Sequence, residues 1–292
     1  MEIKNVGIVG CGTMGGGIAQ VCAQAGYQVH VLEASETLLQ NGIANMKVFL
    51  EKGVQKGKVS AEEKDAVLSR IKGSLNIEDL SVCQLVIEAI VEDMEKKREL
   101  FSKLDKVLPG HAILATNTSS LSIVDMAAAT ARPDKVLGIH FFNPAPLMKL
   151  AEIVETILVS NETVNIAKEF VQSLGKTFIV AKDLPGFVVN YLQYPFRLHA
   201  IRMVERGLAT PEDIDKAARL GLGHPMGPLE LQDLVGLDIT YNACLSIYKE
   251  TNDPAFLPPV LMKKMIAAGK LGRKTGAGFY NYKDSKQAPL KA

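Results

Sequence analysis

The fold of this chain is decided near its start by the stretch Val6-Gly7-Ile8-Val9-Gly10-Cys11-Gly12-Thr13-Met14-Gly15. Its first four residues form a short apolar run without helical spacing, which predicts a strand buried on both faces. The rest is a G-x-G-x-x-G loop, after which apolar residues recur at helical spacing until Gly26. A second apolar run over residues 28–33 ends in Glu33. This order predicts a βαβ unit.

Each glycine of the loop has a separate role in such a unit. Gly10 allows the tight turn, Gly12 allows the backbone to approach a pyrophosphate, and Gly15 allows the helix to pack closely on the strand. The helix N-terminus offers free N–H groups and a partial positive charge to that phosphate. The sequence therefore predicts that the loop, including Thr13 and Met14, binds a dinucleotide.

The acidic end of the second strand supports this prediction. Glu33 lies eighteen residues beyond Gly15, where a carboxylate can accept hydrogen bonds from the adenosine ribose hydroxyls. Its charge would repel a 2′-phosphate, which favours NAD over NADP. A merely structural turn would explain the first two glycines but not this carboxylate. FAD binds to the same fingerprint, so the loop alone leaves FAD open.

Composition limits the classes of protein to which the chain can belong. Because 292 residues exceed the size at which one hydrophobic core stops growing, we expect two domains. The formal net charge of +1 gives no reason to expect a nucleic acid or a membrane surface as partner. The four cysteines lack C-x-x-C spacing, as is typical of reduced thiols in a cytoplasmic protein. Cys11, at a helix N-terminus, could have a lowered pKa, although a small filler of an alanine-sized space is the simpler interpretation. No metal site is predicted.

Beyond Glu33 the chain continues to alternate helical patterns with apolar runs. Residues 35–69 are helical by pattern in two pieces, and the second begins with the capping box Ser60-Ala61-Glu62-Glu63. Further strands are predicted at 85–89, 112–116 and 135–140, with helices near 94–107 and 121–130, and edge strands at 150–155 and 177–181. We therefore predict an α/β fold of the Rossmann type, a doubly wound sheet whose parallel core carries antiparallel edge strands.

The last part of the chain has a different character. Residues 185–292 are mostly helical by pattern and contain no nucleotide motif. We predict a dinucleotide-binding domain over residues 1–184, with the helical insertion at about 35–69, and an all-helical domain over residues 185–292. We expect the helical domain to close the substrate cleft and to mediate homodimerisation. The alternative is that it only packs against the first domain.

A candidate acid–base pair follows the strand at 135–140. His140 ends this run within Gly138-Ile139-His140-Phe141-Phe142-Asn143-Pro144-Ala145-Pro146, and Glu152 lies on the next apolar run. With an unperturbed pKa of about 6.5, a histidine can take and return a proton near neutral pH. The carboxylate can hold one ring nitrogen protonated and leave the other as a base. A lone histidine beside two phenylalanines would more often be a core residue, but the carboxylate on the next strand favours catalysis.

Other polar residues are expected at the same edge of the sheet. Ligands of such a sheet bind at the carboxyl ends of the strands. The residues predicted there are the segments Glu88-Ala89-Ile90-Val91-Glu92 and Asn117-Thr118-Ser119-Ser120. In the helical insertion, lysines cluster at positions 47, 52, 56, 58 and 64. They are either a solvated helix face or a site for a phosphorylated handle of the substrate.

Taken together and in this order, these segments resemble the L-3-hydroxyacyl-CoA dehydrogenases, above all the short-chain bacterial 3-hydroxybutyryl-CoA dehydrogenases. The resemblance covers essentially the whole chain. It includes Asn117–Ile123 and the later segments 185–190, 224–228 and 272–280. It implies an NAD-dependent interconversion of (3S)-3-hydroxyacyl-CoA and 3-ketoacyl-CoA, and it argues against FAD.

The resemblance also implies roles for individual residues. His140 would be the acid–base group, and Glu152 would hold its other ring nitrogen and stabilise the imidazolium. Ser119 and Asn190 would donate hydrogen bonds to the substrate oxygen. Ser120, beside Ser119, is a competing candidate. Contacts to the nucleotide are implied for Glu92, Lys97 and Asn117, and contacts to the coenzyme A phosphates for Lys52 and Lys56.

The chain departs from the family pattern in its second part. Tyr191 follows Asn190 where arginine is common, Leu198-His199 replaces an Asn-Glu pair, and Ala277 stands where a basic residue is usual. These changes concern the acyl pocket and the dimer contacts. Two alternatives stay open at this point. One is the same fold acting on a non-CoA hydroxy acid, such as carnitine or a sugar acid. The other is a non-catalytic NAD-binding structural protein.

Overall fold

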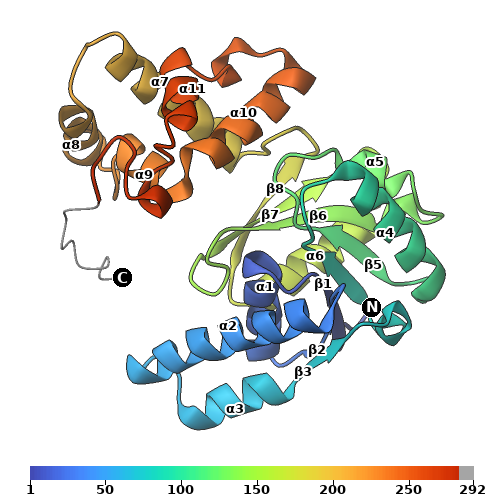
Figure 1. Ribbon diagram of the computed structural model, residues 1–292. Helices are drawn as coiled ribbons and strands as arrows, with labels where there is room; N and C mark the ends of the chain where they lie inside the picture. The colour runs from blue at the N-terminus through green and yellow to red at the C-terminus, as the bar shows by residue number, and fades with distance from the viewer. Residues whose placement is uncertain (283–292) are drawn as a thin grey trace. The chain divides into compact units, whose positions relative to one another are not determined.

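The computed structural model describes residues 1–282, which form two compact units (Figure 1). The first unit is Met1–Phe187, and the second begins at Val188. The last ten residues of the predicted helical domain, 283–292, lie outside the described part of the chain. The first unit is a sheet covered by helices and the second is helical, so the predicted fold class is confirmed.

The sheet of the first unit has the strand order β3-β2-β1-β4-β5-β6-β7-β8. Its strands are β1 (Asn5–Val9), β2 (Gln28–Leu32), β3 (Ile71–Ser74), β4 (Leu85–Glu88), β5 (Ile113–Thr116), β6 (Val136–Phe141), β7 (Leu150–Glu155) and β8 (Thr177–Lys182). Neighbouring strands are parallel except for β6 and β7, which are antiparallel. Hence β7 and β8 run against the core, as expected of edge strands. The strand order reverses between β1 and β4, where such sheets bind their ligands.

Strand β3 was not predicted from the sequence. The sequence of β3 is Ile71-Lys72-Gly73-Ser74, with a single apolar residue, and two of its four residues are exposed. An edge strand needs fewer apolar residues than a central one, so it leaves a weak sequence pattern.

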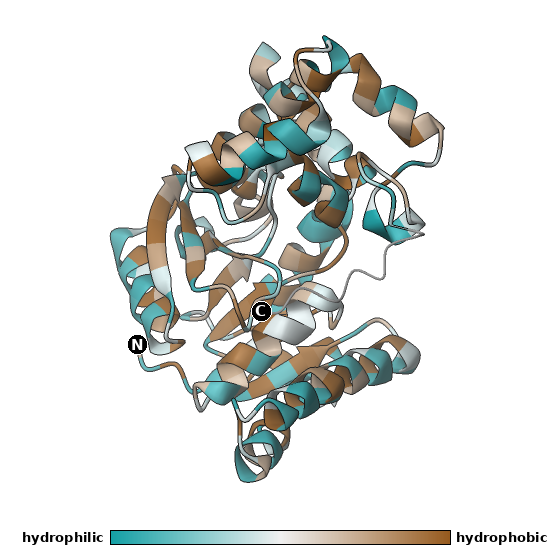
Figure 2. Cartoon of the chain, turned by 90° about the vertical axis from the view of Figure 1, so that its left-hand side faces the viewer, coloured by the Kyte–Doolittle hydropathy of each residue, from teal (hydrophilic) through white to brown (hydrophobic). Residues whose placement is uncertain are grey.

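Helices cover both faces of this sheet. They are α1 (Thr13–Gln24), α2 (Glu36–Gln55), α3 (Ala61–Ser69), α4 (Met94–Val107), α5 (Ile123–Ala127) and α6 (Asn161–Ser173). Apolar residues of α1, α2, α3 and α6 form one core with the sheet, and those of α4 and α5 form another. Figure 2 shows the strands mostly in hydrophobic colours, whereas the helices alternate between hydrophobic and hydrophilic residues. The predicted capping box at the start of α3 is present: the Ser60 hydroxyl accepts from the backbone N–H of Glu63, and Glu63 accepts from that of Ser60.

The second unit has its own hydrophobic core. Its helices are α7 (Val189–Glu205), α8 (Pro211–Gly221), α9 (Pro228–Val235), α10 (Leu237–Thr251) and α11 (Val260–Ala267). They enclose a cluster of buried apolar side chains that includes Leu198, Leu229 and Phe256. Among residues 1–282, no helix has both the length and the apolar character needed to cross a membrane.

Candidate active site

The three glycines of the loop after β1 differ in what surrounds them. Gly10 has φ of +95°, and a Cβ there would lie 2.7 Å from the carbonyl oxygen of Ala89. A Cβ at Gly15 would lie 1.9 Å from the carbonyl oxygen of Gly10. By contrast, a Cβ at Gly12 would meet no atom within 4 Å. Gly10 and Gly15 are therefore required by the fold, whereas Gly12 leaves open space at the start of α1.

That open space adjoins backbone donors. The hydrogen bond from Gly16 N to Gly12 O, 2.8 Å long, closes the first turn of α1. The preceding N–H groups, of Thr13, Met14 and Gly15, belong to the set that a helix N-terminus leaves without intrahelical partners. Together with the helix dipole, such donors suit a phosphate. The start of α1 is thus able to hold a pyrophosphate.

Glu33 is attached to this loop. It follows β2 directly, and its Oε1 accepts a hydrogen bond from the Cys11 backbone N–H at 2.5 Å, while Oε2 accepts from the Ala34 N–H at 2.9 Å. An ionised carboxylate has about four acceptor sites, so both oxygens can still accept ribose hydroxyls. The contact fixes the distance between the acidic side chain and the open space at Gly12.

Cys11 does not have a lowered pKa. Its side chain is buried, and burial, with a smaller contribution from Glu33, raises the pKa of the thiol to about 11. A Cβ added at Gly42 of α2 would lie 2.4 Å from Cys11 Sγ, so α2 packs directly on the thiol. Cys11 is therefore a small residue that fills space between α1 and α2. Loss of solvent raises the pKa of this thiol by more than the helix N-terminus could lower it.

His140 and Glu152 are direct partners in the antiparallel pairing of β6 and β7. Facing residues of such a pair project to the same side of the sheet. The distance from His140 Nδ1 to Glu152 Oε2 is 2.7 Å, and both side chains are buried. Because an ionised carboxylate only accepts, Nδ1 carries the proton and Nε2 is the basic nitrogen. The rings of Phe142 and Phe187 pack against the imidazole, with centroids 4.7 and 5.6 Å away.

The two serines after β5 are in different environments. The Glu92 carboxylate accepts from the Thr118 hydroxyl at 2.5 Å, and from the Ser119 N–H and the Ser120 hydroxyl at 3.2 Å each. The Ser120 hydroxyl is therefore engaged, whereas that of Ser119 makes no hydrogen bond with any residue among 1–282. Burial raises the pKa of Glu92, but the Lys97 ammonium and the Thr118 hydroxyl outweigh it and leave the pKa below its ordinary value. Of the two serines, only Ser119 has a hydroxyl without a hydrogen-bond partner in the described part of the chain.

Glu92 also belongs to a buried cluster of charges with Lys97 and Glu88. The sequence analysis assigned a role to Lys97 but none to Glu88. The Lys97 ammonium is 2.6 Å from Glu88 Oε1 and 3.3 Å from Glu92 Oε2. Glu88 also accepts from the Thr116 hydroxyl and from the Ile90 N–H, each at 2.6 Å. Glu88 and Lys97 are almost fully buried. The available signal was an acidic residue that ends an otherwise apolar strand, with a lysine nine residues later on the next helix.

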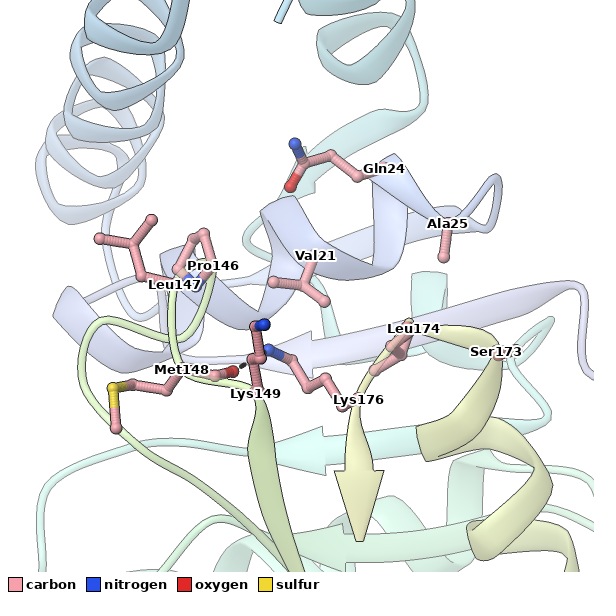
Figure 3. A pocket seen from close by; sticks show the side chains of 11 residues that line it. Val21, Gln24, Ala25, Pro146, Leu147, Met148, Lys149, Ser173, Leu174 and Lys176 are labelled. Atoms are coloured by element: carbon pink, nitrogen blue, oxygen red, sulfur yellow. Dashed lines mark hydrogen bonds between the residues drawn. The ribbon is translucent and has the colours of Figure 1, made fainter. Parts of the chain in front are cut away.

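The backbone that follows His140 is held from two sides. The side-chain oxygen of Asn117 accepts from the Phe141 N–H at 2.8 Å, which connects the ends of β5 and β6. The buried Lys176 donates to the carbonyl oxygen of Ala145 at 2.7 Å. It also donates to that of Met148 at 2.6 Å, near which it lies in Figure 3. A cavity of about 430 Å³ beside this loop is lined by the loop, the end of α1 and the turn before β8. No predicted site residue lines it.

The lysines of the insertion are at the surface. Lys52 lies in the last turn of α2, and Lys56 caps the helix four residues later, so both lie on one side of it. Both are exposed, and neither has an ion pair among residues 1–282. Lys64 of α3, in contrast, pairs with Glu51 at 3.0 Å. Lys52 and Lys56 are thus two cations available to an anionic ligand.

Asn190 belongs to the second unit, in the first turn of α7. Its side chain is buried, and its Oδ1 accepts a hydrogen bond from Gln193 Nε2 at 2.7 Å. The first unit thus carries the His140–Glu152 pair, the Ser119 loop and the nucleotide loop at the carboxyl ends of its parallel strands, whereas Asn190 lies in the helical unit.

Comparisons with known proteins cover both units. The family model of the 3-hydroxyacyl-CoA dehydrogenase NAD binding domain matches residues 5–184, and that of the C-terminal domain of the same family matches residues 186–282. The chain is 47% identical over 282 residues to 3-hydroxybutyryl-CoA dehydrogenase of Mycobacterium tuberculosis, covering 96% of this chain and 99% of the relative. It is 43% identical over 289 residues to 3-hydroxybutyryl-CoA dehydrogenase of Bradyrhizobium diazoefficiens, covering 99% of each. The crystal structure of (S)-3-hydroxybutyryl-CoA dehydrogenase PaaH1 from Ralstonia eutropha superimposes with a TM-score of 0.93 at 42% identity, covering 97% of this chain and 100% of that one.

Proposed function

This chain belongs to the 3-hydroxyacyl-CoA dehydrogenase family, and from this premise we propose that its substrates are the short-chain pair 3-hydroxybutyryl-CoA and acetoacetyl-CoA. It is an NAD-dependent oxidoreductase that interconverts (3S)-3-hydroxyacyl-CoA and 3-ketoacyl-CoA thioesters. The short chain length is supported by the relatives named 3-hydroxybutyryl-CoA dehydrogenase, at 41–47% identity over nearly the whole chain.

The observation that carries the mechanism is the 2.7 Å contact between His140 Nδ1 and Glu152 Oε2. In oxidation, Nε2 of His140 removes the proton of the substrate hydroxyl, and in reduction it returns a proton to the oxygen. The buried carboxylate of Glu152 keeps the proton on Nδ1 and stabilises the imidazolium that forms. The cofactor, held at the loop after β1, would supply the hydride acceptor for oxidation as NAD and the hydride donor for reduction as NADH.

Two further side chains act on the substrate oxygen in this proposal. Ser119 offers an uncommitted hydroxyl, and Asn190 offers the N–H groups of an amide whose oxygen is already bonded. Hydrogen bonds from both would stabilise the negative charge that develops on the oxygen, each worth roughly 3–4 kcal/mol when preorganised. We assign His140, Glu152, Ser119 and Asn190 as the catalytic residues.

The nucleotide site is proposed at the loop after β1. The open space at Gly12 and the N–H groups of Thr13, Met14 and Gly15 would hold the pyrophosphate of NAD, and the carboxylate of Glu33 would accept the ribose hydroxyls. Contacts from Glu92, Lys97 and Asn117 to the nucleotide remain part of the proposal. Because the Lys97 ammonium and the Asn117 oxygen already have protein partners, any contact from these two residues would be shared.

Lys52 and Lys56 are proposed to hold the phosphates of coenzyme A. Their exposure, their position on one side of α2 and their lack of an ion pair among residues 1–282 support this role. We also propose a homodimer formed through the helical unit, and a cytoplasmic location. The location is supported by four cysteines that are all free and buried.

One assay tests the assignment of the substrate. NADH oxidation is followed with acetoacetyl-CoA, with a longer 3-ketoacyl-CoA and with free acetoacetate. We expect the largest kcat/KM with acetoacetyl-CoA. If the longer thioester is preferred, the chain length is wrong. If the free acid is turned over as well as the thioester, the coenzyme A handle has no role and the thioester assignment fails.

A further inference from the structure

The Asn190 side chain stands at the end of a chain of hydrogen bonds inside the helical unit. Its Oδ1 accepts from Gln193 Nε2 at 2.7 Å, and Gln193 Oε1 accepts in turn from Arg197 Nη1 at 3.3 Å. All three residues lie on α7. Among residues 1–282, Nδ2 of Asn190 has no hydrogen-bond partner. The amide is thus bonded on its oxygen side and open on its nitrogen side.

The other end of the chain is anchored in the core of the unit. Arg197 is 2% exposed, and its Nε and Nη2 donate to Gln232 Oε1 at 3.1 and 2.6 Å. Nη2 also donates to the hydroxyl of Thr240, and both partners are fully buried. Gln232 Nε2 donates to the carbonyl oxygen of Gly236 at 3.3 Å, which sets the orientation of that amide.

Packing alone does not explain this arginine. It forms no ion pair with any residue among 1–282, and its hydrogen-bond partners are all neutral. Burying a charge without an opposite charge costs free energy, and an aliphatic side chain would fill the same place at lower cost. A leucine would lack two properties of this arginine. The guanidinium lies over the Tyr194 ring at 5.4 Å from its centroid, and as a hydrogen-bonding group it can only donate.

Because Arg197 can only donate, it fixes the donor-to-acceptor direction of the whole series of hydrogen bonds from Arg197 through Gln193 to Asn190. Gln193 has to turn Oε1 toward Arg197, so its Nε2 faces Asn190. Asn190 then has to turn Oδ1 toward Gln193, which leaves its two N–H donors on the side away from Gln193. We propose that Arg197 and Gln193 are positioning residues that hold the Asn190 amide with its N–H groups toward the substrate oxygen. This inference rests on the proposed role of Asn190 in binding that oxygen.

The orientation matters because an asparagine side chain fits its site equally well after a half-turn about χ2. In the turned state the amide would present an oxygen, rather than N–H groups, to a substrate atom that becomes negative. It would then repel the transition state instead of stabilising it. A fixed donor chain removes the turned state from the population and so raises kcat, with little effect on the binding of the neutral substrate.

The substitution Gln193→Glu reverses the direction at one step without changing size. A glutamate still accepts from Arg197, but it cannot donate to Asn190, so the Asn190 amide has to turn and donate to the glutamate. We expect kcat for acetoacetyl-CoA reduction to fall by roughly a hundredfold, as when one such donor is lost, with little change in KM. Gln193→Met, the matched control, removes both hydrogen bonds and leaves the amide free to adopt either state. Its kcat should fall less, by under about tenfold.

Stability separates this role from a merely structural one. Gln193→Glu places a carboxylate beside a buried arginine and should keep or raise the melting temperature, whereas Gln193→Met should lower it. Activity and stability would thus rank the two variants in opposite orders. If both measurements instead rank them in the same order, Gln193 acts on stability alone and the proposal is wrong.

A double-mutant cycle shows whether the effect passes through Asn190. In an Asn190→Ala background, Gln193→Glu should change kcat by less than about twofold. A full hundredfold loss in that background would overturn the proposal. A readout without substrate covers the case in which the proposed reaction itself fails: the side-chain N–H resonances of Asn190, identified by their absence in Asn190→Ala, should shift in Gln193→Glu as they gain an acceptor. Unchanged resonances would contradict the proposed orientation whatever the substrate is.

Discussion

Glu152 Oε2 lies 2.7 Å from Nδ1 of His140 because the two residues face each other across the only antiparallel junction between neighbouring strands of the described sheet. Every other neighbouring pair of strands is parallel, and a parallel neighbour reaches the same edge only through a long crossover. The reversal at β7 therefore allows a carboxylate only twelve residues away in sequence to orient the imidazole. The pair is complete within the first unit.

Replacement of His140 by asparagine should remove the proton transfer and leave the nucleotide site unchanged. We expect kcat to fall by at least about a hundredfold, the usual size of a general acid–base contribution, because asparagine has no titratable nitrogen. The Kd for NADH, measured by fluorescence titration, should stay within about twofold of wild type. If turnover remains near normal, His140 is a core histidine and the proposed mechanism is wrong.

Loss of one partner of the buried Glu88–Lys97 pair should destabilise the first unit. In Glu88→Gln, the Lys97 ammonium keeps only Glu92 as its counter-ion, and a broken buried pair costs about 3–5 kcal/mol of unfolding free energy. Urea denaturation followed by circular dichroism measures this loss. Glu99→Gln removes the exposed pair with Lys103 on the same helix, and its unfolding curve should match that of wild type. Equal midpoints for the two variants would contradict the prediction.

Removal of the two surface lysines should weaken binding of coenzyme A thioesters only. In Lys52→Ala/Lys56→Ala, KM for acetoacetyl-CoA should rise by roughly tenfold at low salt, since each exposed charge contributes up to about 1 kcal/mol. KM for NADH and for an acetoacetyl thioester of N-acetylcysteamine, which lacks phosphates, should not change. Lys47→Ala, another exposed lysine of α2, serves as the control. A similar rise in KM with the phosphate-free thioester would show that the lysines act on the fold.

The cysteines should make the protein unstable in alkali and resistant to thiol reagents. Burial raises the pKa of Cys11 to about 11 and that of Cys22, Cys83 and Cys244 to about 12, from an ordinary value of 9.0. The thiol pKa is higher in the folded protein than in the unfolded chain. The free energy of unfolding is therefore largest below pH 9 and falls as the pH rises toward 11 and 12. Midpoints of urea denaturation between pH 8 and 11 measure the decline. Labelling with iodoacetamide at pH 8 should require unfolding, and rapid labelling of Cys11 in the native protein would contradict the raised pKa.

The sequence predicted most of the first unit because its central strands are continuous apolar runs, which leave little doubt about burial. It failed for β3, where Lys72 and Gly73 interrupt the pattern and the strand lies at an edge. The sequence also did not predict which charged side chains are buried. The family resemblance implies a nucleotide contact for Lys97, but nothing in the pattern of its charged helix predicts that the side chain is buried. Only the packing of α4 on the sheet brings it to Glu88.

The choice between Ser119 and Ser120 shows the same limit within the site. The two residues are chemically identical neighbours, so no pattern distinguishes them. They differ because the Glu92 carboxylate accepts the hydroxyl of Ser120 but only the backbone N–H of Ser119. Such a difference depends on where a side chain from another segment ends, and it becomes visible only in three dimensions. The assignment of Ser119 to the substrate stays a prediction.

The open space at Gly12 means that selection for folding and selection for cofactor binding would act differently at this position. Its φ of −68° is one that any residue adopts, and a methyl group there would meet no protein atom within 4 Å. With the proposed pyrophosphate site at Gly12, the methyl group of an alanine at position 12 would occupy space that the cofactor needs, and the fold would stay intact. A library screened for folding would tolerate changes at this position, while one screened for turnover would reject them. At Gly10 and Gly15 both screens would reject them.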